Sequence, residues 1–117
     1  MVDFSGTSAN SPNAYPEKRE APRFSLIASA EIIEPASGVH ISGRISEISR
    51  KGCYLDVLNT LPVGTRLRMI ISRDQGVFTS QARIIYVQQG MGMGIAFVDV
   101  PADQLKVLDA WLAEFRR

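Results

Sequence analysis

Between residues 24 and 98 the sequence is a succession of short segments in which apolar and polar residues alternate. A period of two places the apolar side chains on one face of a β-strand, so each segment predicts a half-buried strand. Residues typical of turns separate the segments, for example at 34–38, 59–64 and 74–76. The strands predicted in this way cover residues 24–33, 40–48, 53–57, 66–72, 78–87 and 93–98.

No helical segment interrupts these six expected strands, and their connections are short. Such a pattern favours an antiparallel sheet over a parallel one, which needs long crossover connections. An open sheet of this size would leave two unpaired edges, and closure into a barrel removes them. We therefore predict a mainly all-β domain, a six-stranded antiparallel barrel.

The pattern changes to a helical period after residue 98. Pro101 suits the first helical position, and Asp103 lies near the positive end of the helix dipole. We predict a C-terminal α-helix over residues 101–116 that covers an open end or one side of the barrel, with binding to a partner as the alternative use. Its apolar stripe consists of Leu105, Leu108, Trp111, Leu112 and Phe115.

Residues 1–16 are rich in Ser, Asn, Pro and Gly and lack periodicity, which predicts a disordered N-terminal arm before one domain at 17–116. Thirteen Lys and Arg against 12 Asp and Glu give a net charge of +1, which argues against a nucleic-acid polymer as the partner. A single cysteine and no long apolar segment predict a cytoplasmic protein without membrane insertion.

Groups for catalysis or metal binding are scarce. His40 is the only histidine and lies beside a predicted turn, where a solvated side chain is expected. Cys53 belongs to the apolar face of a strand, which predicts a buried, inert thiol. The glycines at 90–94 lack the lysine and the helix of a phosphate-binding loop, so close backbone approach explains them better. We expect no catalytic residue, no metal site and no cofactor.

Two arginines four residues apart, Arg19 and Arg23, precede the first strand. Pro22 favours an extended or turn-like backbone there, and two side chains at this spacing lie on the same side of the chain. The planar guanidinium group forms paired hydrogen bonds with phosphate or with a guanine edge. A nucleotide-sized anion is one interpretation, and the other is solvated charges with Glu17 and Glu20 as local partners.

A second polar cluster, Glu47, Ser49 and Gly52, lies on the turn between the second and third expected strands. Arg50 and Lys51 add positive charge to it. Gly52 can adopt a positive φ or let a ligand approach the backbone. The pattern fits a compact binding platform or an ordinary polar turn.

Together, Arg-x-x-x-Arg before the first strand and acid-x-Ser-x-x-Gly at the end of the second resemble the PilZ domain family. The resemblance covers roughly residues 17–116, with a Gly-Ile-Ala-Phe element at 94–97 and the terminal helix. It implies a six-stranded PilZ-like barrel that binds the bacterial second messenger cyclic di-GMP. The implied ligand-binding residues are Lys18, Arg19, Arg23, Glu47, Ser49 and Gly52.

In this family the two arginines grip phosphate and guanine, the acid, serine and glycine contact the ligand from the barrel surface, and Lys18 would lie in the loop that wraps it. The chain departs from the family at Glu47, where the pattern has Asp or Asn. The extra methylene moves the carboxylate by more than about 1 Å, on the scale that decides hydrogen bonding. Glu47 either reaches the ligand in another rotamer or pairs with Arg44 or Arg50.

The resulting hypothesis is a non-enzymatic cyclic di-GMP receptor, a monomer or weak dimer. Rearrangement of its N-terminal arm would signal to an unidentified protein partner in trans. One alternative is a degenerate PilZ-like module for protein–protein interaction that binds no nucleotide. Another is a barrel for single-stranded nucleic acid, which would call for exposed aromatic residues along a basic groove.

Overall fold

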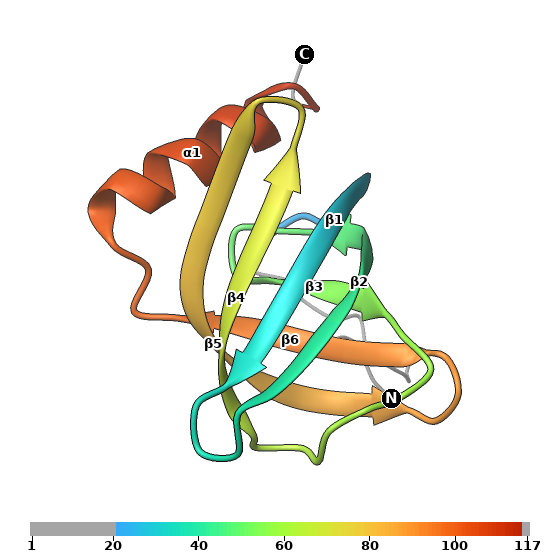
Figure 1. The fold of residues 1–117 in the computed structure, drawn as a ribbon. Helices are drawn as coiled ribbons and strands as arrows, with labels where there is room; N and C mark the ends of the chain where they lie inside the picture. The colour runs from blue at the N-terminus through green and yellow to red at the C-terminus, as the bar shows by residue number, and fades with distance from the viewer. Residues whose placement is uncertain (1–20, 116–117) are drawn as a thin grey trace.

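The computed structural model describes residues 21–115, and within them six strands are followed by one helix (Figure 1). Every predicted strand overlaps an observed one, which confirms the mainly β fold with a C-terminal helix. The elements are β1 (Phe24–Glu34), β2 (Val39–Ile48), β3 (Gly52–Asp56), β4 (Arg66–Arg73), β5 (Gly76–Gln88), β6 (Gly92–Val98) and α1 (Ala102–Ala113).

The six strands form a closed antiparallel barrel in the order β1-β2-β3-β6-β5-β4. Closure comes from β1, which pairs with β2 on one side and with β4 on the other. The expectation of a closed barrel is therefore confirmed. In this order β2 is three strands away from β5, and β3 is three strands away from β4.

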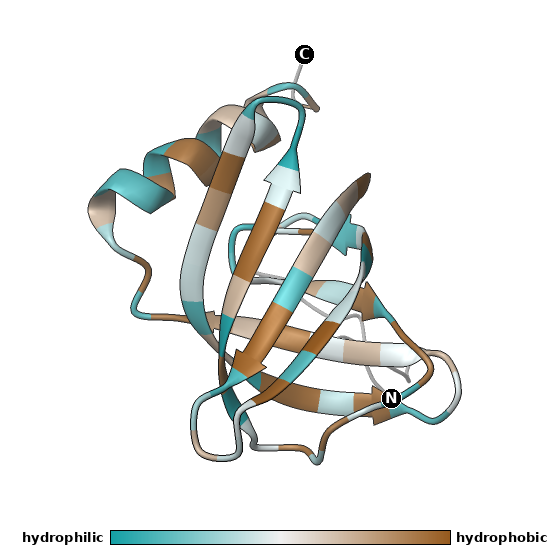
Figure 2. Cartoon of the chain, viewed as in Figure 1, coloured by the Kyte–Doolittle hydropathy of each residue, from teal (hydrophilic) through white to brown (hydrophobic). Residues whose placement is uncertain are grey.

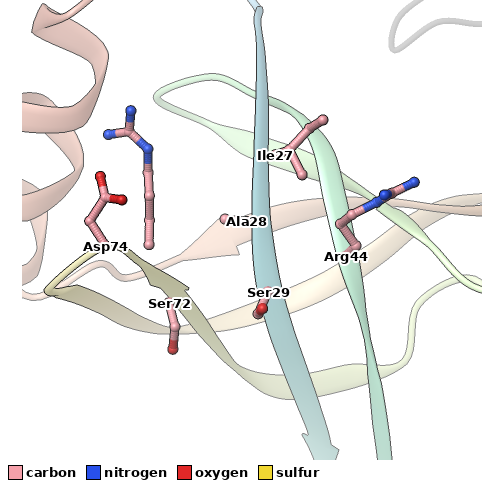
Figure 3. Close-up of a pocket in the computed structure, with 7 residues that line it drawn as sticks. Ile27, Ala28, Ser29, Arg44, Ser72 and Asp74 are labelled. Atoms are coloured by element: carbon pink, nitrogen blue, oxygen red, sulfur yellow. The ribbon is translucent and has the colours of Figure 1, made fainter.

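The seam between β1 and β4 is only partly paired, with Ser29–Ile33 of β1 opposite Arg68–Ser72 of β4. Beyond this stretch the strands diverge, and a cavity of about 400 Å³ opens on the surface. Ile27 and Ser29 line it from β1, Arg44 lines it from β2, and Asp74 lies at its rim (Figure 3).

The barrel interior is filled by the apolar faces that the alternating pattern predicts. Figure 2 shows this alternation as hydrophobic and hydrophilic bands along the strands. In β1 every second residue from Leu26 to Ile32 is buried, and the same holds in β4 from Leu67 to Ile71. The largest fully buried side chains include Phe78, Ile45, Ile48, Leu55, Met69, Ile84, Met93 and Ile95.

Register shifts in β2 and in β5 each turn a side chain outward. In β2 the register against β3 shifts between Ile45 and Glu47, and both Ile45 and Ile48 are buried. Regular alternation would have directed Glu47 into the apolar interior, whereas the bulge exposes part of it. In β5 a similar shift against β6 lies between Ile84 and Tyr86.

Helix α1 packs on the side of the barrel along β5, one of the two predicted arrangements (Figure 1). Its buried residues are Leu108, Trp111 and Leu112. The Trp111 ring lies 6.4 Å from Phe78, and Phe115 stacks on Phe24 at the start of β1, with ring centroids 5.1 Å apart. The apolar stripe predicted for this helix thus covers one end of the barrel wall.

The helix is shorter than the predicted range of 101–116. Pro101 is the N-cap residue, with an extended ψ of 150°, so helical residues begin at Ala102. Ala113 ends the helix, and the N–H of Glu114 donates to the last turn. Among the described residues, no helix has the length and apolar character needed to cross a membrane.

Candidate ligand-binding site

The start of β1 and the end of β2 bring two of the predicted site residues together. Antiparallel pairing places Ser25 opposite Glu47, so Arg23 lies beside the Glu47 carboxylate. The Arg23 Nη1 is 3.1 Å from the Glu47 Oε1, and the side chains are 18% and 39% exposed. An arginine and a carboxylate therefore meet on the outer wall of the barrel, within reach of solvent.

Glu47 does not pair with Arg44 or Arg50, the two partners considered from the sequence. The Arg44 Nε lies 3.9 Å from Asp56 on the neighbouring strand, and Arg50 pairs with Asp109 on α1. Because Asp56 and Asp109 are nearer to these arginines, they are the partners, and the Glu47 carboxylate turns toward Arg23. The longer side chain of Glu47 is thereby held beside one of the predicted ligand-binding arginines.

Ser49 is buried in the turn between β2 and β3, with only 4% of its surface exposed. Its Oγ accepts hydrogen bonds from the backbone N–H groups of Lys51, at 3.1 Å, and Gly52, at 3.2 Å. The Ser49 N–H in turn donates to the Gly52 carbonyl at 2.8 Å. The hydroxyl group therefore fixes the conformation of the turn, as serine commonly does next to free backbone donors.

Gly52 is needed where β3 passes close to β6. A Cβ atom at this position would overlap the carbonyl oxygen of Ile95 in β6. Gly52 is not among the described residues with a positive φ, so the first reason considered from the sequence does not apply. The space beside its Cα is occupied by the backbone of β6, and the neighbouring Lys51 carbonyl accepts a hydrogen bond from Phe97 N–H at 2.9 Å.

The same turn is tied to helix α1 by Arg50. Its Nε and Nη2 lie 3.0 and 3.4 Å from the two carboxylate oxygens of Asp109, and this hydrogen bonding raises the pKa of the Arg50 guanidinium group. A second connection is the stacking of Phe24, which follows Arg23, on Phe115. The start of β1 and the turn between β2 and β3, which carry the candidate site, are thus both in direct contact with the C-terminal segment.

A groove of about 310 Å³ lies next to Glu47 on the outer face of the barrel. Ser46 and Glu47 of β2, Tyr54 of β3, and Tyr86 and Gln88 of β5 line it. The two tyrosine rings are 6.2 Å apart and tilted by 34°, and the Tyr54 hydroxyl donates to Gln88 Oε1 at 2.5 Å. Aromatic side chains therefore form one wall of the groove that the Glu47 carboxylate enters.

Glycines of β6 make room for these rings. A Cβ at Gly94 would overlap the Tyr86 ring, and one at Gly92 would overlap Tyr54 and the Leu55 carbonyl. The close approach expected for the glycine-rich run is therefore made largely by the two tyrosines. Burial, and next the nearby Asp56 carboxylate, raise the pKa of Tyr54.

The sequence analysis did not identify Tyr54, Tyr86 or Gln88 as site residues. The spacing of Gly92 and Gly94, two residues apart on one face of β6, was the signal that could have indicated them. Glycines at alternate positions leave a strip without side chains, which bulky residues of the flanking strands can cover. The bulge before Tyr86, which decides the direction of its side chain, has no comparable signature.

Two of the predicted ligand-binding residues, Lys18 and Arg19, lie outside the described residues. His40 is exposed, with Nε2 3.3 Å from Glu31 Oε1, and Cys53 is buried, so that desolvation raises the pKa of its thiol. Within residues 21–115 no group of three His, Cys, Asp or Glu side chains could hold a metal ion.

The family model described as PilZ domain matches residues 17–114. The fold is similar to the crystal structure of YcgR in complex with c-di-GMP from Escherichia coli, with a TM-score of 0.74 and 18% identity. It is also similar to the inhibitor of motility MotI/DgrA of Bacillus subtilis, with a TM-score of 0.73 and 14% identity. These matches cover 86% of this chain but only 47% and 52% of the other two, so the chain spans about half their length.

The PilZ domain of CeSA from a cellulose-synthesizing bacterium is matched over nearly its whole length, 99%, and over 82% of this chain. Here the TM-score is 0.63 and the identity 17%. No curated protein matches the chain. At these identities the solved structures establish the fold, and the family model, which spans most of the chain, establishes the family. The chain therefore belongs to the PilZ domain family, whose members are binding and regulatory modules that include receptors for cyclic di-GMP.

Proposed function

We propose that this chain binds cyclic di-GMP on the outer wall of the barrel, at the groove beside Glu47. The observation that carries the proposal is the meeting of Arg23 and Glu47 at 3.1 Å beside that aromatic-walled groove. Two proteins of similar fold, YcgR and MrkH, form complexes with the same ligand.

The chemistry of the groove suits a cyclic dinucleotide, which carries two phosphate charges and two guanine bases. Arg23 can form paired hydrogen bonds with a phosphate or with the acceptor edge of guanine. Glu47 can accept hydrogen bonds from the N–H groups of the opposite guanine edge. The rings of Tyr54 and Tyr86 offer a surface for base stacking, which contributes about 1–3 kcal/mol per base in other proteins.

Ser49 and Gly52 act indirectly in this proposal. Both are buried, with the hydroxyl of Ser49 bonded within the turn and Gly52 packed against β6. They fix the turn that follows Glu47, and so they set the direction of its carboxylate. Contact with the ligand would come from the exposed backbone and side chains of the turn.

Binding has to compete with the pairing of Arg23 and Glu47. Both side chains are partly exposed, and ion pairs of this kind contribute about 0–1 kcal/mol. Micromolar affinity corresponds to about 8 kcal/mol, so the loss of this pair is a minor cost. Glu47 therefore does not preclude binding by keeping Arg23 from the ligand.

The proposed signal combines the described site with Lys18 and Arg19, which precede it in the sequence. Binding would draw the segment that carries them onto the barrel and change the surface offered to a protein partner in trans. Protease cleavage around residues 10–20, measured with and without saturating cyclic di-GMP, tests this step. Unchanged cleavage would rule out the rearrangement while leaving ligand binding itself intact. We further propose that the protein acts in the cytoplasm.

Calorimetric titration with cyclic di-GMP at near-physiological salt tests the proposal as a whole. We expect low-micromolar or tighter binding by the wild type and its loss in Arg23→Ala. Arg68→Ala is the matched control, because Arg68 is also an outward-facing arginine but lies on β4, which contributes no residue to the groove. Equal affinity of all three proteins would place the ligand elsewhere.

The second candidate function is a PilZ module for protein–protein interaction that does not bind nucleotide. Glu47, at a position where the family has Asp or Asn, favours this alternative. Absence of binding by the wild type would support it, and Glu47→Asp would then be titrated. If Glu47→Asp binds cyclic di-GMP, the extra methylene of Glu47 is the reason that the wild type does not. If Glu47→Asp does not bind it either, the protein–protein interaction module remains as the function.

A further inference from the structure

The arginines of the described residues are divided sharply between two environments. Seven lie within residues 21–115, and four of them pair with a carboxylate: Arg23 with Glu47, Arg44 with Asp56, Arg50 with Asp109 and Arg73 with Glu114. The other three are Arg66, Arg68 and Arg83, and within the same residues none of them lies within 4.0 Å of a carboxylate.

These three arginines are neighbours on one outward face of β4 and β5, here called the arginine face. Arg66 is directly opposite Arg83 in the β4–β5 ladder, and Arg68 follows Arg66 on the same side of β4. All three are exposed. Directly opposite residues have Cα atoms about 5 Å apart, and alternate residues of a strand are about 7 Å apart. Three positive charges therefore lie within a small area.

No carboxylate is directly opposite any of these arginines. Arg83 is opposite Ala96 on β6, and Arg68 is opposite Gln81 on β5 and Ile33 on β1. Like charges directly opposite each other in a sheet are unfavourable. The arrangement thus lowers the stability of the free domain slightly, which indicates that its use lies in an interaction.

The arginine face borders an exposed apolar side chain at the end of the β3–β4 loop. This residue is Val63, which is 61% exposed and precedes Gly64 and Thr65. The end of the loop lies beside the arginine face, because Gly64 N–H donates to the Ile84 carbonyl of β5 at 2.7 Å and the Thr65 carbonyl accepts from Ile84 N–H at 3.0 Å. Arginine combined with apolar anchors is typical of the residues that dominate protein–protein interfaces.

The chemistry favours a protein over a membrane or a nucleic acid. Sites for anionic lipids commonly contain clusters of about 4–8 basic residues, more than this face offers. A single-stranded nucleic acid would need aromatic platforms, and no aromatic residue is directly opposite these arginines on the neighbouring strands. Arginine forks match carboxylates in a paired geometry, and apolar residues of the same partner would cover Val63.

We propose that the arginine face is a docking surface for an acidic, partly apolar segment of a partner protein. Because none of these three arginines lines the groove beside Glu47, the partner can bind while that groove is occupied. Helix α1 leaves the arginine face open, since its contacts with β5 are at the other end of the strand, where Trp111 lies near Gly76 and Gln104 accepts from Thr79 N–H.

Fluorescence anisotropy with a labelled peptide rich in glutamate and leucine tests the proposal directly. We expect wild-type protein to bind this peptide more tightly than the same peptide with glutamine in place of glutamate, and affinity to fall as salt is raised. The double variant Arg66→Gln/Arg83→Gln should bind about tenfold more weakly. Arg44→Gln, the control, should bind like the wild type.

Two further measurements separate the alternatives. Vesicles containing phosphatidylserine and an oligonucleotide of equal charge should bind more weakly than the peptide, and tighter binding of either would overturn the proposal. The double variant should melt at the same or a higher temperature than the wild type, since it removes a like-charge pair. A lower melting temperature would show that these arginines stabilise the fold. Peptide binding unaffected by the double variant would show that the peptide does not bind at these arginines, and either result would overturn the proposal.

Discussion

Replacement of Gly52 by alanine tests whether the glycine of the turn motif serves the fold or the ligand. Gly52 is buried where β3 pairs with β6, opposite Ala96. The added methyl group would overlap the Ile95 carbonyl, a backbone atom of the adjacent strand. Relief requires the two strands to separate, and the hydrogen bond from Phe97 N–H to the Lys51 carbonyl, now 2.9 Å, would lengthen with them.

The cost can be estimated from these contacts. Overpacking of a rigid interior costs about 3 kcal/mol at the upper end of the usual range. Alanine recovers about 1 kcal/mol, because glycine loses more conformational freedom on folding. The net destabilisation is therefore about 2 kcal/mol, which for a domain of this size lowers Tm by roughly 8–16 °C.

Urea and thermal unfolding followed by circular dichroism and by the fluorescence of the single tryptophan, Trp111, would measure the change. Gly38→Ala is the control: Gly38 has a φ of +79° but no atom within 4 Å of an added Cβ, so only backbone strain of about 1 kcal/mol is expected. A Gly52→Ala protein as stable as the wild type, but unable to bind cyclic di-GMP, would refute the packing argument and make Gly52 a ligand contact.

Three further outcomes are expected. Tyr86→Leu keeps apolar bulk beside the groove but removes the aromatic face, so cyclic di-GMP should bind about tenfold more weakly by calorimetry, and unchanged affinity would exclude stacking on this ring. The Cys53 thiol, whose pKa is raised by burial, should react with Ellman's reagent only after unfolding; rapid reaction in native buffer would contradict the buried position. Arg50→Ala should make a fragment containing α1 more accessible to limited proteolysis, because it removes the two hydrogen bonds to Asp109, and equal cleavage rates would show that the pair does not hold the helix.

The fold was largely predictable because its core follows a simple period. Alternation in β1 and β4 identifies the buried residues correctly, and the short turns between the strands require antiparallel neighbours. Closure followed from the argument about sheet edges. The helix ends were less predictable: Pro101 suits both the N-cap and the first helical position, and the apolar stripe continues to Phe115 beyond the last helical residue, Ala113.

The candidate site was only partly predictable, since it depends on two irregularities and on contacts between distant residues. The register shifts that expose Glu47 and Tyr86 interrupt strands whose sequences alternate or run apolar without a clear break. The choice of Arg23 as the partner of Glu47, over Arg44 and Arg50, is decided by Asp56 and Asp109, which only the folded chain brings near. Motif spacing indicated which residues to examine but not what each one touches.

The most direct test of the proposed receptor function is a titration of the ¹⁵N-labelled protein with cyclic di-GMP, followed by amide chemical shifts. The largest changes are expected at Glu47, Tyr54 and Tyr86, which line the groove, while the amides of Arg66 and Arg68 on β4, which contributes no residue to the groove, should keep their shifts. Shifts concentrated on β4, or no shifts at a large excess of ligand, would contradict the proposal that the groove beside Glu47 binds cyclic di-GMP.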